Sequence, residues 1–188
     1  VTISDSSGYV VDEAGIDLDL LKQVKEVERG RVADYAARRP GARVATGGSV
    51  WQVPCDVALP CATQNELDGD AAATLVKNGC GVVAEGANMP STPEAIEVFQ
   101  KAGILYAPGK AANAGGVATS ALEMEQNASR TRWDFETANA KLTDIMADIH
   151  DSCVETAERY GQPGNYVLGA NVTGFTSVAD VMIAHGII

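Results

Sequence analysis

Short apolar runs alternate along this chain with longer segments whose apolar residues recur at helical spacing. Short, wholly apolar runs are typical of strands that helices bury on both faces. The alternation itself indicates βα units arranged around a parallel sheet. The pattern predicts strands at residues 1–4, 57–60, 81–85 and 104–107, with a weaker extended segment at 42–45 or 50–53.

Capping residues mark the ends of the helical segments. Thr92 precedes a proline and a glutamate, which predicts a helix start with a hydroxyl cap, and Gly103 predicts its end. Asp17, Asp70 and Asp134 stand where a carboxylate caps a helix. The predicted helices are residues 18–38 with a break near Gly30, 71–78, 93–103, 116–130, 134–160 and 172–185, with a loop at 161–169.

These elements predict an α/β fold with a Rossmann-type parallel sheet, incomplete at its N-terminus, and a C-terminal helical segment. We place the dinucleotide-binding domain at residues 1–115 and the helical segment at residues 116–188. The chain begins with the tail of a strand, without Met or a leading helix. We therefore expect it to be the C-terminal piece of a longer protein whose first βα unit is missing here.

Composition narrows the class of protein. A hydrophobic content of 46% and a charged content of 21% are ordinary for a soluble globular protein. The net charge of -11 argues against nucleic acid and acidic membranes as partners. No continuous apolar run approaches the roughly 20 residues of a membrane helix. The four cysteines lack paired spacing, so we expect buried thiols rather than disulfides or a metal site, in a cytoplasmic protein.

Small polar turns follow three of the predicted strands, at residues 61–65, 86–90 and 110–123. In a parallel sheet such turns share one edge, where ligands bind. Gly115 and Gly116 would let a ligand approach the backbone, since neither has a Cβ. Asn113 offers a donor and an acceptor, which suits a carboxamide such as that of nicotinamide. An ordinary helix-capping loop is the alternative for each turn taken alone.

The phosphate-binding pattern G-x-G-x-x-G is absent, and Asp5 stands where a Rossmann unit ends its second strand. A carboxylate there favours the ribose diol of NAD. Ser6, together with Lys25, Arg29 and Arg31 on the following helix, favours the 2′-phosphate of NADP. A solvated helix face is the alternative for these cations.

Several segments together carry a resemblance to a known family. They are residues 4–8, 30–35, 56–66, 83–90, 107–123 and 165–171. From Asp5 to its end the chain resembles the cofactor-domain half of the hexameric glutamate dehydrogenases, especially the bacterial NADP-preferring type. These enzymes belong to a family that also contains leucine, phenylalanine and valine dehydrogenases.

The resemblance implies a cofactor site and part of a substrate site. Asn88 and Asn113 would hold the nicotinamide ribose and carboxamide. Val117 and Ser120 would line the glutamate pocket, where the Ser120 hydroxyl supplies the donor that a buried carboxylate needs. The implied cofactor-binding residues are Asp5, Ser6, Lys25, Arg31, Ala62, Thr63, Gln64, Asn88 and Asn113.

The resemblance also implies the reaction: reversible oxidative deamination of L-glutamate to 2-oxoglutarate and ammonia with NADP(H), in a homohexamer. The family's catalytic Lys and Asp lie N-terminal to this chain, so we expect no catalytic residue here and an inactive chain in isolation. One alternative is an NAD-linked glutamate dehydrogenase or a branched-chain amino acid dehydrogenase. Another is a non-catalytic module that binds a nucleotide or a partner protein.

Overall fold

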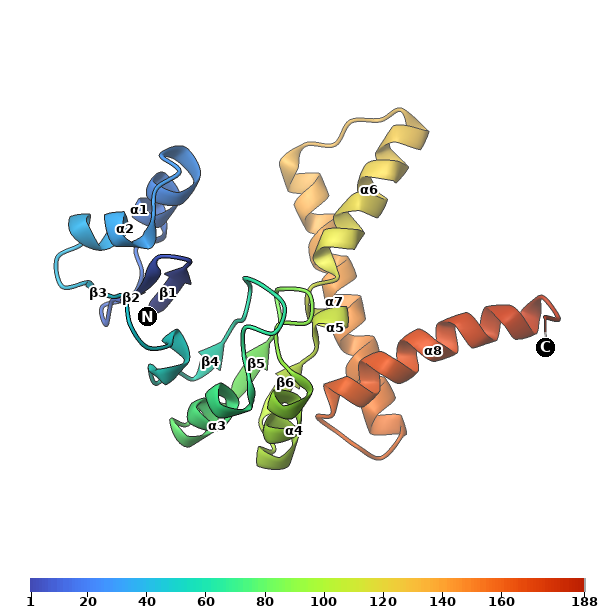
Figure 1. Ribbon diagram of the computed structural model, residues 1–188. Coiled ribbons are helices and arrows are strands. Elements are labelled where there is room, and N and C mark those ends of the chain that lie inside the picture. Colours follow the sequence, from blue (N-terminus) through green and yellow to red (C-terminus); the bar gives the residue numbers. More distant parts are fainter. Residues whose placement is uncertain (188) are drawn as a thin grey trace.

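The chain forms two three-stranded sheets surrounded by helices, which confirms the predicted α/β class (Figure 1). The computed structural model describes residues 1–187. The strands are β1 (Thr2–Asp5), β2 (Gly8–Val11), β3 (Arg43–Ala45), β4 (Val57–Ala58), β5 (Val82–Ala84) and β6 (Leu105–Ala107). The helices are α1 (Leu18–Lys22), η1 (Gln23–Val27), α2 (Val32–Arg38), η2 (Val50–Gln52), α3 (Gly69–Lys77), α4 (Pro93–Ala102), α5 (Gly109–Ala112), α6 (Gly115–Ser129), α7 (Phe135–Arg159) and α8 (Tyr166–Ala184).

The first sheet, in the order β1-β2-β3, is antiparallel, which corrects the expectation of parallel strands for this part of the chain. After Asp5, a two-residue turn reverses the chain directly into β2, a strand that the pattern did not predict. Gly8 has a φ of +139°, and a Cβ there would collide with the carbonyl oxygen of Ala45. The turn therefore depends on glycine, which adopts this backbone conformation without strain.

The second sheet, in the order β4-β5-β6, is parallel, as predicted. Its register pairs Val83 with Ala58 on one side and with Tyr106 on the other. Helices α3 and α4 connect these strands and share a core with them, in which Phe99 and Tyr106 stack with ring centroids 5.6 Å apart. Among the strands of residues 1–187, none pairs with the outer edge of β1 or of β4.

Most helix ends lie where the capping residues predicted them. The hydroxyl of Thr92 accepts a 3.3 Å hydrogen bond from the Ala95 amide, and Gly103 ends α4 with a φ of +70°. The predicted break near Gly30 is present, because α1 and η1 end before Arg31 and α2 begins after it. The weaker extended segment is β3, whereas residues 50–52 form the short helix η2.

Two helices begin earlier than predicted. Asp68, rather than Asp70, caps α3 by accepting a 2.9 Å hydrogen bond from the Ala71 amide. Asn165 caps α8 by accepting a 3.0 Å hydrogen bond from the Leu168 amide, so this helix includes part of the predicted loop.

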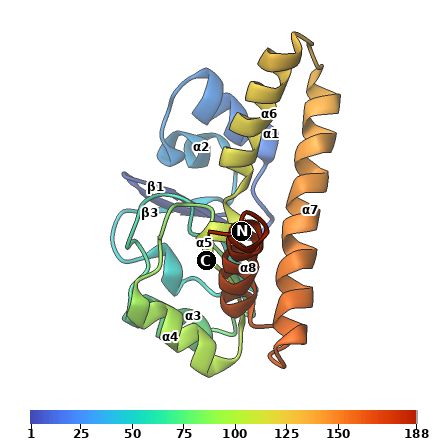
Figure 2. The same cartoon turned by 90° about the vertical axis from the view of Figure 1, so that its right-hand side faces the viewer.

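The three long helices α6, α7 and α8 extend beyond the two sheets (Figures 1 and 2). Asp134 caps α7, as predicted. Helix α8 crosses α7 where Gly169 lies against the backbone of Cys153, and a Cβ at Gly169 would collide with the Cys153 carbonyl oxygen. Close to this crossing the Thr173 hydroxyl donates a 2.9 Å hydrogen bond to the Thr156 hydroxyl.

Within residues 1–187, α8 alone has the length and composition to cross a membrane, and almost none of it is buried. The expectation that no continuous apolar run approaches about 20 residues nevertheless holds within α8. Glycine, threonine, serine and asparagine interrupt every apolar run in α8, yet it carries only one charged side chain, Asp180. Its average composition is therefore apolar although no continuous stretch is. Length and composition alone do not place the helix in a membrane.

Candidate functional site

The loops that follow β4, β5 and β6 lie at the same edge of the parallel sheet and are hydrogen-bonded to one another. The Gly86 and Ala87 amides both donate to the Pro60 carbonyl, at 3.0 and 3.1 Å. The Asn65 amide donates to the Met89 carbonyl at 3.0 Å. The structure thus brings two of the three predicted polar turns into direct backbone contact.

The buried carboxylate of Glu85 joins the second loop to the third. Its Oε2 atom accepts a 2.6 Å hydrogen bond from the Gly109 amide, and its Oε1 atom accepts one of 3.1 Å from the Ser91 amide. Glu85 was not predicted as a site residue. An acidic residue directly after an apolar strand was the available signal, because a buried carboxylate requires donors around it.

Tyr106 adds a second buried polar group beside Glu85. Burial, reinforced by the neighbouring Glu85 carboxylate, raises the pKa of the Tyr106 phenol well above its usual range. The phenol is therefore protonated at neutral pH. Tyr106 is a neutral neighbour of Glu85 rather than an acid or base.

Asn113 is fixed by the loop after β5. Its Nδ2 atom donates a 2.9 Å hydrogen bond to the Ala87 carbonyl, which leaves its Oδ1 atom and one N–H for other partners. The preceding Gly109 permits this packing, because a Cβ there would lie 3.1 Å from the Ala87 carbonyl oxygen and 3.2 Å from Asn113 Nδ2. Asn88, one residue after Ala87, is exposed. Asn113, predicted as a nicotinamide ligand, is therefore bonded to the residue that precedes Asn88, the other predicted ligand.

The first loop presents a polar, exposed rim. Ala62, Thr63 and Gln64 are all exposed, and the Ala62 amide donates a 2.8 Å hydrogen bond to the Glu66 carboxylate. Gly86 lies against this loop, since a Cβ at Gly86 would collide with the Cys61 sulfur. The rim is therefore held close to the loop after β5.

Val117 and Ser120 lie on α6, which begins two residues after Asn113. They are three residues apart and so share one helix face. Both are exposed, and the Ser120 hydroxyl donates a 3.3 Å hydrogen bond to the Gly116 carbonyl one turn earlier. The hydroxyl oxygen still has lone pairs, and the O–H can rotate toward another acceptor.

A second polar cluster lies at the turn between β1 and β2. Lys25 Nζ contacts Asp5 Oδ2 at 2.8 Å, and the Val32 amide donates to the same oxygen at 3.0 Å. Arg31 Nη1 donates a 3.0 Å hydrogen bond to the Ser6 hydroxyl. The four predicted residues of this region, Asp5, Ser6, Lys25 and Arg31, are therefore in contact in pairs.

The charge of Asp5 is already engaged within this cluster. Burial by itself would raise the pKa of Asp5, but hydrogen bonds from Lys25, Ser7 and Val32 outweigh it and hold the pKa well below its usual range. Asp5 is therefore ionised and neutralised by Lys25. Arg31 and Ser6 remain exposed at the turn and provide a positive charge and a hydroxyl donor.

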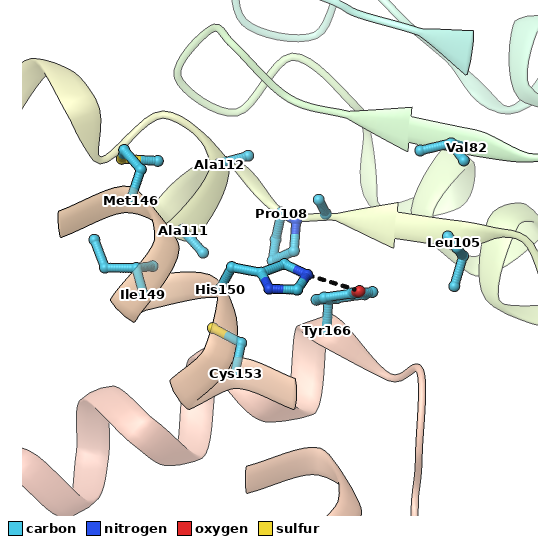
Figure 3. Close-up of a pocket in the computed structure, with 11 residues that line it drawn as sticks. Val82, Leu105, Pro108, Ala111, Ala112, Met146, Ile149, His150, Cys153 and Tyr166 are labelled. Carbon is cyan, nitrogen blue, oxygen red and sulfur yellow. Dashed lines mark hydrogen bonds between the residues drawn. The ribbon is translucent and has the colours of Figure 1, made fainter. Parts of the chain in front are cut away.

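A separate cavity of about 340 Å³ lies behind α5, between the parallel sheet and α7 (Figure 3). Its lining is mostly apolar and includes Val82, Leu105 and Met146. At its rim His150 Nε2 lies 3.2 Å from the Tyr166 hydroxyl, with the hydrogen bond drawn in Figure 3. His150, on α7, is exposed.

No group of three or more His, Cys, Asp or Glu side chains in residues 1–187 has an arrangement that could hold a metal ion. The predicted site residues themselves offer amide, hydroxyl and ammonium or guanidinium groups. Such groups bind and orient a polar or anionic ligand.

Comparison with known proteins gives a consistent result. Residues 1–186 match the family model described as Glutamate/Leucine/Phenylalanine/Valine dehydrogenase. The chain is 56% identical to the NADP-specific glutamate dehydrogenase of Escherichia coli and 52% identical to that of Helicobacter pylori. The whole chain aligns in both cases, but it spans only 42% and 43% of those relatives' length.

Solved structures agree with this match. A glutamate dehydrogenase of Plasmodium falciparum superposes with a TM-score of 0.91 at 45% identity, over 98% of this chain and 40% of that one. A hetero-hexameric glutamate dehydrogenase of Thermus thermophilus superposes with a TM-score of 0.74 at 24% identity, over 92% of this chain and 39% of that one. The second similarity shows the shared fold alone.

Proposed function

Because this chain belongs to the glutamate/leucine/phenylalanine/valine dehydrogenase family, we propose that it is the cofactor-binding part of an NADP-dependent glutamate dehydrogenase. The parent enzyme would catalyse reversible oxidative deamination of L-glutamate to 2-oxoglutarate and ammonia. Bound NADP(H) would supply the hydride acceptor and donor. The residues of this chain would bind and orient the cofactor and the substrate.

The arrangement at the β1–β2 turn supports NADP rather than NAD as the cofactor. Lys25 and the Val32 amide occupy Asp5 Oδ2, so this carboxylate is less available to a ribose diol and repels a phosphate less. Arg31 and Ser6 stand at the same turn and offer charge-assisted and hydroxyl donors to a phosphate dianion. The residues present fit an anionic 2′-phosphate.

At the other end of the cofactor, Asn113 and Asn88 would hold the nicotinamide carboxamide and ribose. The hydrogen bond from Asn113 to the Ala87 carbonyl supports this role, because it orients the side-chain amide before any ligand binds. Ala62, Thr63 and Gln64 would border the cofactor from the loop after β4. These groups orient the reacting ring and exclude water; they do not transfer protons.

Val117 and Ser120 would form one wall of the glutamate pocket. Their shared face on α6 begins just after Asn113, so a substrate bound there would lie next to the nicotinamide. The Ser120 hydroxyl would donate to the substrate γ-carboxylate, and an apolar amino acid could not replace that interaction. This favours glutamate over leucine or valine as substrate.

We place the dinucleotide-binding domain at residues 1–115 and the helical segment at 116–188. The free edges of β1 and β4 support the insertion of a further strand between the two sheets, contributed by the remainder of the parent. Alone, the chain should bind cofactor weakly and catalyse nothing. The parent would act in the cytoplasm as a homohexamer.

Cofactor titration of the full-length parent tests this proposal. Turnover of 2-oxoglutarate and ammonia is measured with NADPH and with NADH, and kcat/KM should be larger with NADPH. Equal or larger kcat/KM with NADH would contradict the NADP assignment. Turnover of leucine or valine above that of glutamate would contradict the substrate, and no turnover at all would favour a non-catalytic binding module.

A further inference from the structure

Cys55 and Cys80 lie at the starts of neighbouring parallel strands. The register pairs Val57 of β4 with Val82 of β5, and continuing it backward by two residues places Cys55 opposite Cys80. Two hydrogen bonds hold this end of the strand pair together, because the Gly81 and Val82 amides donate to the Asp56 carbonyl at 2.9 and 3.2 Å. Both cysteines are free thiols.

The Cys80 thiol lies beside the backbone next to Cys55. Its Sγ atom donates a 3.3 Å hydrogen bond to the Val82 carbonyl and lies 3.7 Å from the carbonyl of Asp56, the residue that follows Cys55. Neighbouring parallel strands lie about 4.8 Å apart, which is within the Cα separation of roughly 4.4–6.8 Å that a disulfide spans. Cys80 is buried, whereas Cys55 is partly exposed and therefore open to a small reagent.

We propose that Cys55 and Cys80 form an oxidisable pair that closes into an intramolecular disulfide at the amino-terminal edge of the parallel sheet. Among the four cysteines, Cys61 and Cys153 serve as internal comparisons, since the first is exposed and the second is buried in contact with α8. The proposal does not depend on the catalytic role of the parent enzyme.

The oxidant is a low-molecular-weight disulfide. The Cys55 thiolate attacks one sulfur of this disulfide, which forms a mixed disulfide and releases one small thiol. Cys80 then loses its proton and attacks the Cys55 sulfur, which forms the protein disulfide and releases the second small thiol. The two protein thiols lose two protons and two electrons, and the oxidant takes both up.

The environment of Cys55 makes this reaction slow but does not prevent it. Burial, with the neighbouring Cys80 thiol, raises the pKa of Cys55 to about 11, so little thiolate is present at neutral pH. Once formed, the bond would close a loop of residues 55–80 that contains α3 and the rim residues of the first loop. Closing a loop of this length should raise the thermal midpoint by roughly 5–10 °C.

The test uses the whole chain with Cys61→Ser and Cys153→Ser, which leaves only the proposed pair. After incubation with excess oxidised glutathione, both thiols should disappear, and the intact mass should fall by two hydrogen atoms. Non-reducing peptide mapping should recover one cross-linked peptide. Adding Cys55→Ser to this background should leave a thiol or a single glutathione adduct and remove the rise in thermal midpoint.

Peptide mapping of the wild-type chain after the same treatment gives the answer if the double variant does not fold. A Cys55–Cys80 peptide would support the pair in either protein. Two unmodified thiols after prolonged oxidation, a stable mixed disulfide, or a bond from Cys55 to Cys61 would overturn the proposal.

Discussion

Glu85 Oε2 accepts a 2.6 Å hydrogen bond from the Gly109 amide, across 24 residues of sequence, and this bond sets the position of α5 relative to the loop after β5. The same carboxylate also holds the Ser91 amide. The candidate nicotinamide end of the site is therefore organised by a residue whose own side chain is buried.

Replacement of Glu85 by Gln should destabilise the protein. A glutamine offers only one acceptor oxygen, so its amide group must face one of two backbone N–H donors and leave it unpaired. We expect the free energy of unfolding to fall by about 1–3 kcal/mol in urea titrations. Glu97→Gln, on the exposed face of α4, is the matched control and should change stability by less than about 0.5 kcal/mol. Equal losses of unfolding free energy at both positions would contradict the proposal that Glu85 holds the two backbone amides.

Arg31→Ala in the parent enzyme should weaken NADPH binding and leave NADH binding nearly unchanged. The loss of one charge-assisted hydrogen bond corresponds to a rise in KM for NADPH of roughly 10- to 100-fold. Arg43→Ala serves as the control, because it removes an exposed arginine of β3 that is paired with Glu13. A parallel rise in KM for both cofactors would argue against a phosphate contact at Arg31.

Asn113→Asp should impair cofactor use more than folding. The aspartate is nearly isosteric, but its carboxylate would face the Ala87 carbonyl oxygen in place of the Nδ2 donor. We expect kcat/KM of the parent to fall by about 10-fold or more, since a charge-assisted or well-placed hydrogen bond contributes about 1.5 kcal/mol. Asn139→Asp on the exposed face of α7 is the control. Wild-type kinetics for Asn113→Asp would exclude it from the site.

The ion pair of Asp5 and Lys25 should contribute to stability in a pH-dependent way. The folded-state pKa of Asp5 lies below its unfolded value, so the contribution is fully present above the unfolded pKa of about 4 and is lost as the pH falls through the folded pKa. The difference in unfolding free energy between wild type and Asp5→Asn should therefore shrink below about pH 4. A difference that stays constant from pH 7 to the acid limit would show that the pair carries no such linkage.

The crossing of α7 and α8 should depend on one glycine. Gly169→Ala places a methyl group against the Cys153 backbone, and we expect a loss of about 1–3 kcal/mol in unfolding free energy. Gly174→Ala in the same helix meets nothing within 4 Å and should stabilise the protein by about 0.5–1 kcal/mol. If both substitutions stabilise, the helices do not cross as closely as described.

Local signals in the sequence accounted for the helix starts at Thr92 and Asp134 and for the break near Gly30, because each cap satisfies backbone groups within a few residues of itself. The direction of β2 could not be read in the same way. It follows from a two-residue turn and from the contact of Gly8 with Ala45, a residue far along the chain. Pairing between distant segments leaves little trace in a pattern of apolar and polar positions.

The candidate site likewise combines residues that the sequence marks locally with contacts between distant segments. Exposed polar residues such as Asn88 and Ser6 stand out in the sequence because each follows closely on a predicted strand. The bonds that place them do not, since Glu85 meets Gly109, and Arg31 meets Ser6, only after the loops have packed. Family resemblance supplied the proposed role of each residue, whereas the structure supplied the contacts.

The unpaired edges of β1 and β4 differ in what they offer to another polypeptide. An open strand edge is a row of free peptide donors and acceptors, and its capacity to template association grows with its length. Strand β4 has two residues, too few for a lasting ladder, whereas β1 has four and lies beside an exposed N-terminal residue, Val1. Of these two edges, β1 is therefore the better template for strand addition by another polypeptide.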